Sequence, residues 1–366
     1  MSRHRTMDSP YMHWAKTFQT ARFTLAVSGI KGLSLAELGA TLDDLALDGV
    51  TGYGHPQLRS ALAAKSGVSD DRIVLATGTS GANHLAFETL LDSGDEVAME
   101  RPGYEPMEML ASHLGATVRY FPRRPENGFR VDPKDVAASV TSRTRLIVVS
   151  NLHNPTSVAT DEPTLREIGT IAERVGAKVL VDEAYLDAAF ESAPPSAGRL
   201  GDVFVVTTSL TKVFGLSGLR CGWIVAAPAL ASKIWQLKNL FGVNEAHPAG
   251  CLALRALRTS GEILARTREI LEANRAAWEA FHAGRQDLVL EGDSRGTTVF
   301  PRVVSCDADA LCEHLRERYE TSLVPGRFFG APAYVRVGLC GDPEIFREGL
   351  VRLGSALSDL NGKGSA

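Results

Sequence analysis

Residues 145–157 read RLIVVSNLHNPTS, an apolar run that ends abruptly in polar residues. Residues 177–185, AKVLVDEAY, repeat this pattern, and so do residues 203–212, VFVVTTSLTK. Continuous β-branched runs of this kind are typical of strands buried on both faces, which belong to parallel sheets. The segment TLREIGTIAERVG (164–176), which lies between two of these runs, has its apolar residues at helical spacing. We therefore predict an α/β fold with a mainly parallel sheet.

The apolar runs extend this sheet in both directions along the chain. Four more of them are predicted strands, namely RIVLATG (72–78), DEVAMERPG (95–103), ATVRYFP (116–122) and GWIVAAP (222–228). Helical spacing predicts further helices over residues 59–67 and 82–94, which stop at Gly67 and Gly94. Together these elements predict a seven-stranded sheet with helices between its strands.

The pattern changes after about residue 245, where one or two long helices rich in Ala, Leu, Arg and Glu extend to about Gly284. The residues that follow alternate short strand candidates with a helix, and the first forty or so residues do not fit the α/β alternation either. We predict a large domain at residues 46–245. A smaller α+β domain is then formed by both chain ends, residues 1–45 and 246–366.

Composition excludes several classes of protein. The chain has 366 residues, with 39 Lys and Arg against 43 Asp and Glu, and this net charge of −4 gives no general attraction to nucleic acid or acidic membranes. Five cysteines without C-x-x-C spacing predict neither a disulfide framework nor a thiolate metal site. Neither a signal peptide nor an apolar stretch of the ~18–20 residues that a membrane span needs is present. We expect a cytoplasmic protein with no metal and no membrane partner.

Chemically useful side chains follow three successive predicted strands. Asn154 comes after the first, Asp182 after the second and Lys212 after the third. Ligands in open parallel sheets gather outside the carboxyl ends of the strands. Taken singly, Asp182 reads as a helix cap, Asn154 as part of a turn and Lys212 as a surface residue. Their occurrence at the same end of three strands predicts a shared site instead.

These residues meet the separate needs of one cofactor, pyridoxal phosphate. The amine of Lys212 forms a Schiff base with an aldehyde. The carboxylate of Asp182 keeps a pyridine nitrogen protonated, which makes the ring an electron sink. Asn154 and Tyr185 can donate hydrogen bonds to the phenolate oxygen. We therefore predict Lys212, Asp182 and Tyr185 as catalytic residues.

A phosphate site is predicted beside them. Arg220 offers a guanidinium and Ser209 a hydroxyl. The segment TGTSGANHLAF (77–87) reads as the end of a strand followed by a helix that starts near Ala82, and a helix start binds phosphate through its free N–H groups. The segment is neither a P-loop nor a dinucleotide-binding G-x-G-x-x-G. The missing glycine fingerprint disfavours a nucleotide-dependent enzyme.

The residues SLTKVFGLSGLRCGW (209–223) resemble the Schiff-base lysine region of the class I and II aminotransferases, which are fold type I enzymes of pyridoxal phosphate. NLHNPTS (151–157) resembles the Asn-Pro-Thr-Gly turn of that family, and DEAY (182–185) resembles its segment with the ring-nitrogen aspartate. The resemblance extends from about Gly49 to Cys340. Ser157 departs from the family glycine, and Thr211 stands where the family often has serine.

By position, the resemblance implies further cofactor contacts. Gly78, Thr79 and Ser80 would bind the phosphate through backbone and hydroxyl groups, together with Ser209 and Arg220. Tyr104 in RPGYEP (101–106) matches the aromatic residue that stacks on the pyridine ring.

The resemblance also implies a substrate site and a homodimer. Arg336 matches the arginine that grips the substrate α-carboxylate, which a planar guanidinium binds bidentately. Gly29 lies in the segment that closes over the same carboxylate, and Asn154 is also expected to bind the substrate. Tyr53 is expected to reach the phosphate of the neighbouring subunit, and Asn244 to lie at the subunit interface. We interpret Arg22, Arg123, Arg124 and Arg255 as surface residues that do not select the side chain.

The resemblance implies transfer of an amino group between an L-amino acid and a 2-oxo acid. A β-eliminating lyase or a β/γ-replacing synthase would use the same residues, and so would decarboxylation or cyclisation. A non-catalytic sensor of pyridoxal phosphate is a further alternative, disfavoured because no basic N-terminal domain is present. The side chain of the substrate stays open.

Overall fold

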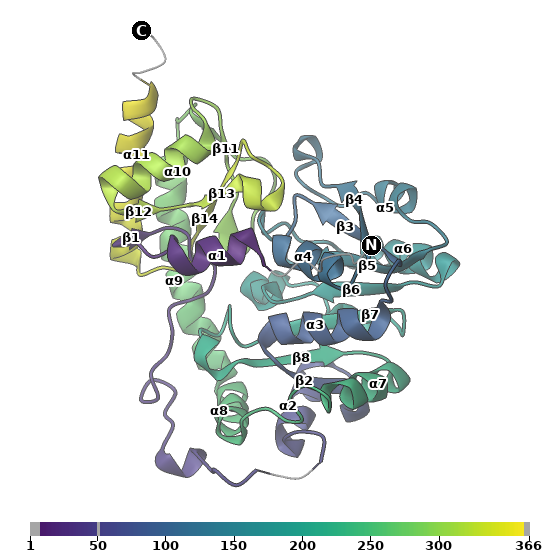
Figure 1. Cartoon of the computed structure of the whole chain (residues 1–366). Helices are drawn as coiled ribbons and strands as arrows, with labels where there is room; N and C mark the ends of the chain where they lie inside the picture. The colour runs from purple at the N-terminus through teal and green to yellow at the C-terminus, as the bar shows by residue number, and fades with distance from the viewer. Residues whose placement is uncertain (1–7, 50–51, 362–366) are drawn as a thin grey trace.

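A seven-stranded sheet forms the centre of the structure, a computed structural model that describes residues 8–49 and 52–361 (Figure 1). The strand order is β2 (Ile73–Thr77), β8 (Cys221–Val225), β7 (Phe204–Ser209), β6 (Lys178–Asp182), β5 (Thr144–Ser150), β3 (Glu96–Arg101) and β4 (Thr117–Pro122). Strand β8 is antiparallel to both of its neighbours, and the other pairs are parallel. The predicted α/β fold with a mainly parallel sheet is thus confirmed.

Helices connect and cover these strands, at the following bounds: α2 (Pro56–Ser66), α3 (Gly78–Leu90), α4 (Glu105–His113), α5 (Pro133–Ser139), α6 (Glu162–Val175) and α7 (Pro228–Lys238). Helix α3 packs on β2, β7 and β8, whereas α6 packs on β5 and β6. Helices α2 and α6 end at Gly67 and Gly176, which adopt the left-handed conformation that glycine tolerates best. The apolar residues of β5, β6 and β7 are buried, as expected for strands covered on both faces.

The bounds predicted for the helix over residues 82–94 were wrong. Helix α3 begins four residues earlier, at Gly78, and ends at Leu90. Leu91 is extended, and the N–H of Asp92 donates to the side chain of Asp95 at 2.8 Å, so a tight turn replaces the last predicted turn of helix. The early start places Thr79 and Ser80 inside the first turn of α3.

The rest of the chain packs beside this sheet (Figure 1). Its helices are α1 (Pro10–Thr17), α8 (His247–Arg258), α9 (Ser260–His282), α10 (Ala308–Tyr319) and α11 (Pro343–Asn361). A small antiparallel sheet has the order β10 (Thr298–Val299), β14 (Val335–Gly338) and β13 (Val324–Pro325), and a second pairs β9 (Leu288–Val289) with β11 (Arg302–Val303). Strand β1 (Phe23–Thr24) pairs with β12 (Thr321–Ser322), so segments from the first and last parts of the chain lie side by side. The domain boundaries at 46–245 stay a prediction.

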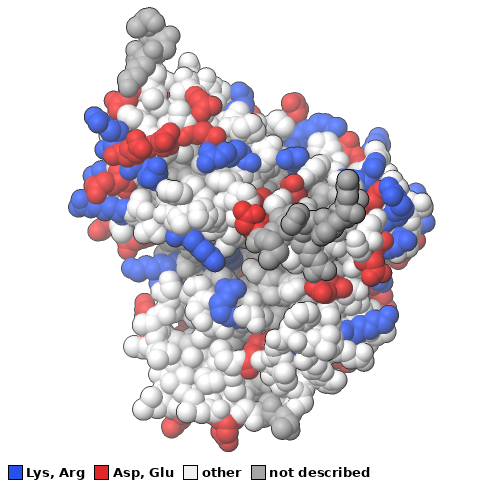
Figure 2. Space-filling model, viewed as in Figure 1, with Lys and Arg blue, Asp and Glu red and all other residues white. Residues whose placement is uncertain are grey.

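The surface carries charges of both signs. Figure 2 shows acidic and basic residues interspersed over the upper part of the molecule and fewer of them over the lower part, where α2 and α8 lie. Within residues 8–49 and 52–361, no helix combines the length and the apolar character that a membrane span requires.

Candidate active site

A cavity of about 470 Å³ lies where the carboxyl ends of the sheet strands converge. The register of the sheet explains the convergence, because Ser150 is paired with Asp182, and Asp182 with Thr207 on the next strand. The cavity is lined by many of the predicted residues: Thr79, Ser80, Tyr104, Asn154, Asp182, Tyr185, Ser209, Lys212 and Arg220. Met12, Lys16, Asn83, Ser150, Ala184 and Thr211 complete the lining.

The other predicted residues lie either next to this lining or away from it. Gly29 and Gly78 lie directly behind it, against Lys212 and Arg220, and Arg336 is hydrogen-bonded to Asn154. Tyr53 does not line the cavity, because its half-exposed ring packs at 5.2 Å from the ring of Trp235.

Lys212 is held in place through both its backbone and its side chain. Its carbonyl accepts a hydrogen bond from the N–H of Ile30 at 2.8 Å. Its Nζ lies 3.4 Å from the hydroxyl of Ser28, which lies 2.9 Å from the hydroxyl of Tyr185. The phenol of Tyr185 raises the pKa of Lys212 more than burial lowers it. The amine therefore has to lose a proton before it attacks a carbonyl.

Asp182 is a buried carboxylate that accepts from two neutral donors. Its oxygens accept hydrogen bonds from the N–H of Ala184 at 2.9 Å and from the amide of Asn83 at 3.3 Å. Asn83 is itself fixed by the hydroxyl of Thr207 at 2.6 Å. Burial raises the pKa of Asp182 to about 6 despite these bonds. A protonated ring nitrogen at this point would offset the cost of the buried charge.

Asn83 is a functional residue that the sequence analysis did not identify. It lies one turn along α3 from Thr79, and it is buried among apolar residues of that helix. An asparagine among the apolar residues of this helix is a local sign of a buried polar group with a specific partner, but it does not indicate that the partner is Asp182.

The first turn of α3 and Arg220 form a positive end of the cavity. Thr79 donates its hydroxyl proton to Ser209 at 2.8 Å. The guanidinium of Arg220 is exposed, with one hydrogen bond to the Thr77 carbonyl at 3.4 Å. The nearby hydroxyl of Thr211 is buried without a hydrogen-bond partner among the described residues. A cation, a helix start and an unsatisfied hydroxyl around one space fit a phosphate group.

Gly78 sets the distance between α3 and Arg220. It has a φ of +67°, its N–H donates to the Arg220 carbonyl at 2.7 Å, and a Cβ at this position would lie 2.3 Å from Nη2 of Arg220. The close approach of the two backbones is required for the guanidinium to lie over the helix start.

Gly78→Ala is therefore expected to weaken the binding of pyridoxal phosphate at least about tenfold, because Arg220 must move away from the helix start. A spectrophotometric titration of the cofactor measures this affinity. Gly176→Ala is the matched control, since Gly176 has a φ of +72° and a Cβ there would meet no described atom within 4 Å. Gly176→Ala has the same backbone strain as Gly78→Ala, about 1–2 kcal/mol, but no clash with a neighbouring side chain. Equal loss of cofactor affinity in Gly78→Ala and Gly176→Ala would show that Gly78 does not act by placing Arg220.

Arg336 is a buried cation without an anionic partner among the described residues. Its side chain donates to Asn154 Oδ1 at 2.9 Å, to the hydroxyl of Tyr11 at 3.1 Å and to the carbonyl of Ala26 at 3.3 Å. Its Nε has no hydrogen-bond partner in the part of the chain that the structure describes, and Arg336 is 1% exposed. A buried guanidinium without an anionic partner is costly, and an anionic group of a bound ligand would offset this cost.

Tyr104 lines the cavity near Arg336, and Tyr11 packs against it. The ring of Tyr11 meets that of Tyr104 edge-on at 5.8 Å, and the hydroxyl of Tyr104 lies 3.8 Å from the sulfur of Met12. Tyr11 and Met12 belong to α1 and were not identified from the sequence. No local pattern distinguishes them, because their partners come from distant parts of the chain.

The interpretation of Arg123 as a surface residue was wrong. Arg123 is 1% exposed and forms an ion pair with Glu100 at 2.8 Å. It follows directly after β4, and its guanidinium also donates to the Phe129 carbonyl and to the hydroxyl of Thr160. Arg22 and Arg124 are exposed and Arg255 is half-buried, and none of the three lines the cavity.

Three comparisons with known proteins agree with this geometry. The model of the family "Aminotransferase class I and II" matches residues 42–353. The chain is similar to capreomycidine synthase from Streptomyces vinaceus, with 31% identity over 93% of this chain and 91% of the relative. It is also similar to arginine–pyruvate transaminase from Pseudomonas aeruginosa, with 30% identity over 88% and 86%.

A solved structure of a PLP-dependent aminotransferase from Streptococcus suis superimposes on this fold. The TM-score is 0.91 at 27% identity, and the match covers 98% of this chain and 99% of that one. The family model, the relatives and this structure agree with the chemistry of the cavity. The chain therefore belongs to the class I and II aminotransferase family and is an enzyme that depends on pyridoxal phosphate.

Proposed function

We propose that the enzyme transfers an amino group from an L-amino acid to a 2-oxo acid. The observation that carries this proposal is the unpaired buried guanidinium of Arg336, held by Asn154 at the edge of the cavity that contains Lys212 and Asp182. Amino acids and oxo acids share the α-carboxylate that such a cation recognises. Both half-reactions can therefore use one site.

Each residue has a defined task in this proposal. Bound pyridoxal phosphate supplies an electron-withdrawing ring that stabilises negative charge at the substrate Cα. Asp182 would hold the proton on the ring nitrogen of the bound cofactor, and Lys212 would accept the proton that leaves the substrate Cα. Arg336 holds the carboxylate so that the Cα–H bond faces Lys212. Tyr185 and the amide of Asn154 donate hydrogen bonds to the phenolate oxygen.

Arg336→Lys is expected to raise KM for the amino acid about 100-fold and to lower kcat as well. A lysine keeps the charge but loses the planar fork, so both affinity and the orientation of the Cα–H bond suffer. Steady-state kinetics with a series of amino acids measures both constants. Arg255→Lys is the control, because Arg255 lies outside the cavity and donates to the Leu38 carbonyl. Unchanged kinetics in Arg336→Lys contradict the assigned role.

A synthase reaction is the second candidate, because the relative with 31% identity is named a synthase. Elimination, replacement or cyclisation would start from the same proton removal by Lys212, and the cofactor would return to its aldehyde form without net amino transfer.

A half-reaction distinguishes the two candidates. The enzyme loaded with pyridoxal phosphate is mixed with single amino acids in the absence of an oxo acid. Transamination converts the cofactor stoichiometrically to pyridoxamine phosphate and releases one oxo acid. A synthase or lyase instead turns over repeatedly, leaves the cofactor as the aldehyde and releases ammonia, another leaving group or a cyclic product. Amino acids that give neither result are not substrates, and a complete failure of the panel opposes both reactions.

We further propose that the enzyme is a homodimer. Large apolar side chains are exposed in two segments of the described chain, at Leu42, Leu47 and Tyr53, and at Leu240, Phe241 and Val243. Asn244 ties the segments together through Gly52 and Gly54, both at 2.9 Å. An apolar surface of this kind is typical of an interface. Sedimentation of the wild-type protein and of Leu240→Asp tests this assembly. In the proposed dimer, Tyr53 reaches the cofactor phosphate of the neighbouring subunit.

We also propose a cytoplasmic location. All five cysteines are free in the structure, which fits a reducing compartment. Cell fractionation with an antibody against the protein tests the location.

A further inference from the structure

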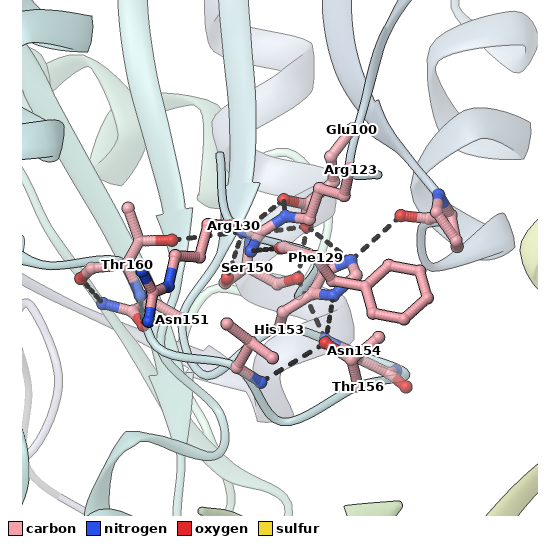
Figure 3. A network of polar contacts seen from close by, with 12 residues as sticks. Glu100, Arg123, Phe129, Arg130, Ser150, Asn151, His153, Asn154, Thr156 and Thr160 are labelled. Atoms are coloured by element: carbon pink, nitrogen blue, oxygen red, sulfur yellow. Dashed lines mark hydrogen bonds and ion pairs between the residues drawn. The ribbon is translucent and has the colours of Figure 1, made fainter. Parts of the chain in front are cut away.

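A buried ion pair lies behind the cavity, at the ends of β3 and β4 (Figure 3). Nε of Arg123 donates to Glu100 Oε2 at 2.8 Å, and the two side chains are 0% and 6% exposed. Replacing such a pair by apolar residues is often neutral or stabilising, because removing two charges from water is costly. The ion pair therefore needs an explanation other than the stability of the fold.

Hydrogen bonds lead from this ion pair to the substrate site. Glu100 Oε1 accepts the N–H of Ser150 at 2.8 Å and also its hydroxyl proton. Oγ of Ser150 accepts the N–H of Asn154 at 3.2 Å. Asn154 Oδ1 then accepts from Arg336 at 2.9 Å. We call Arg123, Glu100, Ser150 and Asn154 the Glu100 network.

The charges fix the direction of every bond in this network. A carboxylate only accepts, so the hydroxyl of Ser150 donates to Glu100 and keeps its lone pairs for the N–H of Asn154. A guanidinium only donates, so Asn154 turns its oxygen to Arg336. The amide nitrogen of Asn154 is thereby left to donate into the cavity that Asn154 lines.

The surroundings leave the network no alternative arrangement. The remaining nitrogens of Arg123 donate to the Phe129 carbonyl at 3.1 Å and to the hydroxyl of Thr160 at 3.2 Å. His153 lies 3.8 Å from Glu100, but burial lowers its pKa well below the usual value. It is neutral and donates instead to the Pro102 carbonyl at 2.9 Å. Arg123 is thus the cation that neutralises Glu100 among the described residues.

We propose that Glu100 and Arg123 are positioning residues that hold the backbone at Asn154 and so fix the point from which its side-chain amide meets Arg336. The proposal rests on the proposed roles of Asn154 and Arg336. Arg336 turns the oxygen of the Asn154 amide toward itself, and the network holds the backbone of Asn154 in place, so that a single residue presents an oxygen to the carboxylate-binding arginine and a nitrogen to the cofactor. Loss of the network releases the backbone N–H of Asn154, which displaces the side-chain amide and weakens both contacts.

Three variants break the network in different ways. Ser150→Ala removes the link and leaves the ion pair intact. Both carboxylate oxygens of Glu100 accept hydrogen bonds, and Glu100→Gln replaces one of them by an NH₂ group that can only donate. Glu100→Leu combined with Arg123→Met removes the ion pair without leaving a buried unpaired charge, which protects the fold. Glu96→Gln is the matched control, because Glu96 lies at the other end of β3, is 1% exposed and accepts from Thr141 at 2.6 Å and from Arg143.

The readouts are made on the enzyme loaded with pyridoxal phosphate. Propionate is the probe of the carboxylate site, and its affinity is read from the change that it causes in the absorbance of the bound cofactor. The pH titration of the same absorbance reports the hydrogen bond to the phenolate oxygen. We expect all three network variants to bind propionate about tenfold more weakly and to shift this titration to higher pH, whereas Glu96→Gln matches the wild type.

The possible outcomes are distinct. Unchanged propionate affinity and titration in Ser150→Ala and in the double variant Glu100→Leu, Arg123→Met overturn the proposal. Equal changes in Glu96→Gln also overturn it, because they indicate a general loss of stability. If wild-type enzyme itself fails to bind pyridoxal phosphate or propionate, the proposed function fails instead.

Discussion

Lys212→Ala is expected to lower kcat by at least about 10⁴-fold, the largest effect of any single substitution in this enzyme. The variant loses both the amine that anchors the cofactor and the group that moves the proton at Cα, and general acid–base catalysis alone contributes about 10²–10⁴-fold. Steady-state kinetics and single-turnover absorbance measure the loss. An added small primary amine is expected to restore part of the rate, because it can occupy the space of the missing side chain.

Borohydride reduction gives a second, independent measurement. In the wild type the reduced protein is expected to carry one pyridoxyl group on the peptide that contains Lys212. Lys65→Ala is the control, since Lys65 pairs with Asp187 at 2.6 Å away from the cavity lining. Labelling that persists in Lys212→Ala, or that disappears in Lys65→Ala, contradicts the assignment.

Asp182→Asn is expected to lower kcat about 10³-fold and to weaken the binding of pyridoxal phosphate. The neutral amide cannot hold the proton on the ring nitrogen, so the ring withdraws electrons less strongly. Kinetics and cofactor titration measure the two effects. Unaltered cofactor affinity in this variant is the outcome that contradicts the assigned role.

The same substitution is expected to stabilise the protein when the cofactor has been removed. Burial raises the pKa of Asp182 to about 6, so ionisation opposes folding once the pH rises above the unfolded-state pKa. The cost grows between about pH 4 and 6 and reaches at most about 3 kcal/mol above that range. Asp182→Asn should therefore raise the Tm of the cofactor-free protein at pH 8 and leave it unchanged near pH 4.

Glu183→Gln separates the two effects of Asp182→Asn. Burial raises the pKa of Glu183 to about 7, and its carboxylate accepts the N–H of Ala197 at 2.7 Å outside the cavity lining. This variant is expected to stabilise the cofactor-free protein in the same way and to keep its cofactor affinity. If Glu183→Gln also loses cofactor affinity, both substitutions act by distorting strand β6, and the loss in Asp182→Asn does not come from the missing partner of the ring nitrogen.

The strands and many of the residues that line the cavity were predictable because their determinants are local. Each strand is marked by a buried apolar run, and Asn154, Asp182 and Ser209 lie where the runs end. Parallel strands bring their carboxyl ends to one edge of the sheet, so the position of a residue in the chain sufficed to place it at the cavity. The bounds of α3 were less accurate, because its first turn consists of small residues that also favour turns.

Residues whose role depends on a distant partner were not predictable. Arg123 has a charged neighbour in Arg124 and reads as a surface residue, yet it is a buried ion paired with Glu100 on another strand. Asn83 acquires its importance from Asp182, and Tyr11 from Arg336, which lies 325 positions further along the chain. Nothing in their own segments specifies these contacts.

The sequence by itself determined the mainly parallel sheet and the residues suited to pyridoxal phosphate, since apolar periodicity and the chemistry of Lys212 are properties of short segments. Only the tertiary structure decided which groups hold those residues in place. The Glu100 network and the unpaired guanidinium of Arg336 arise when β3, β4, β5 and β14 come together, and burial then gives their charges an energetic weight that they lack in an unfolded chain.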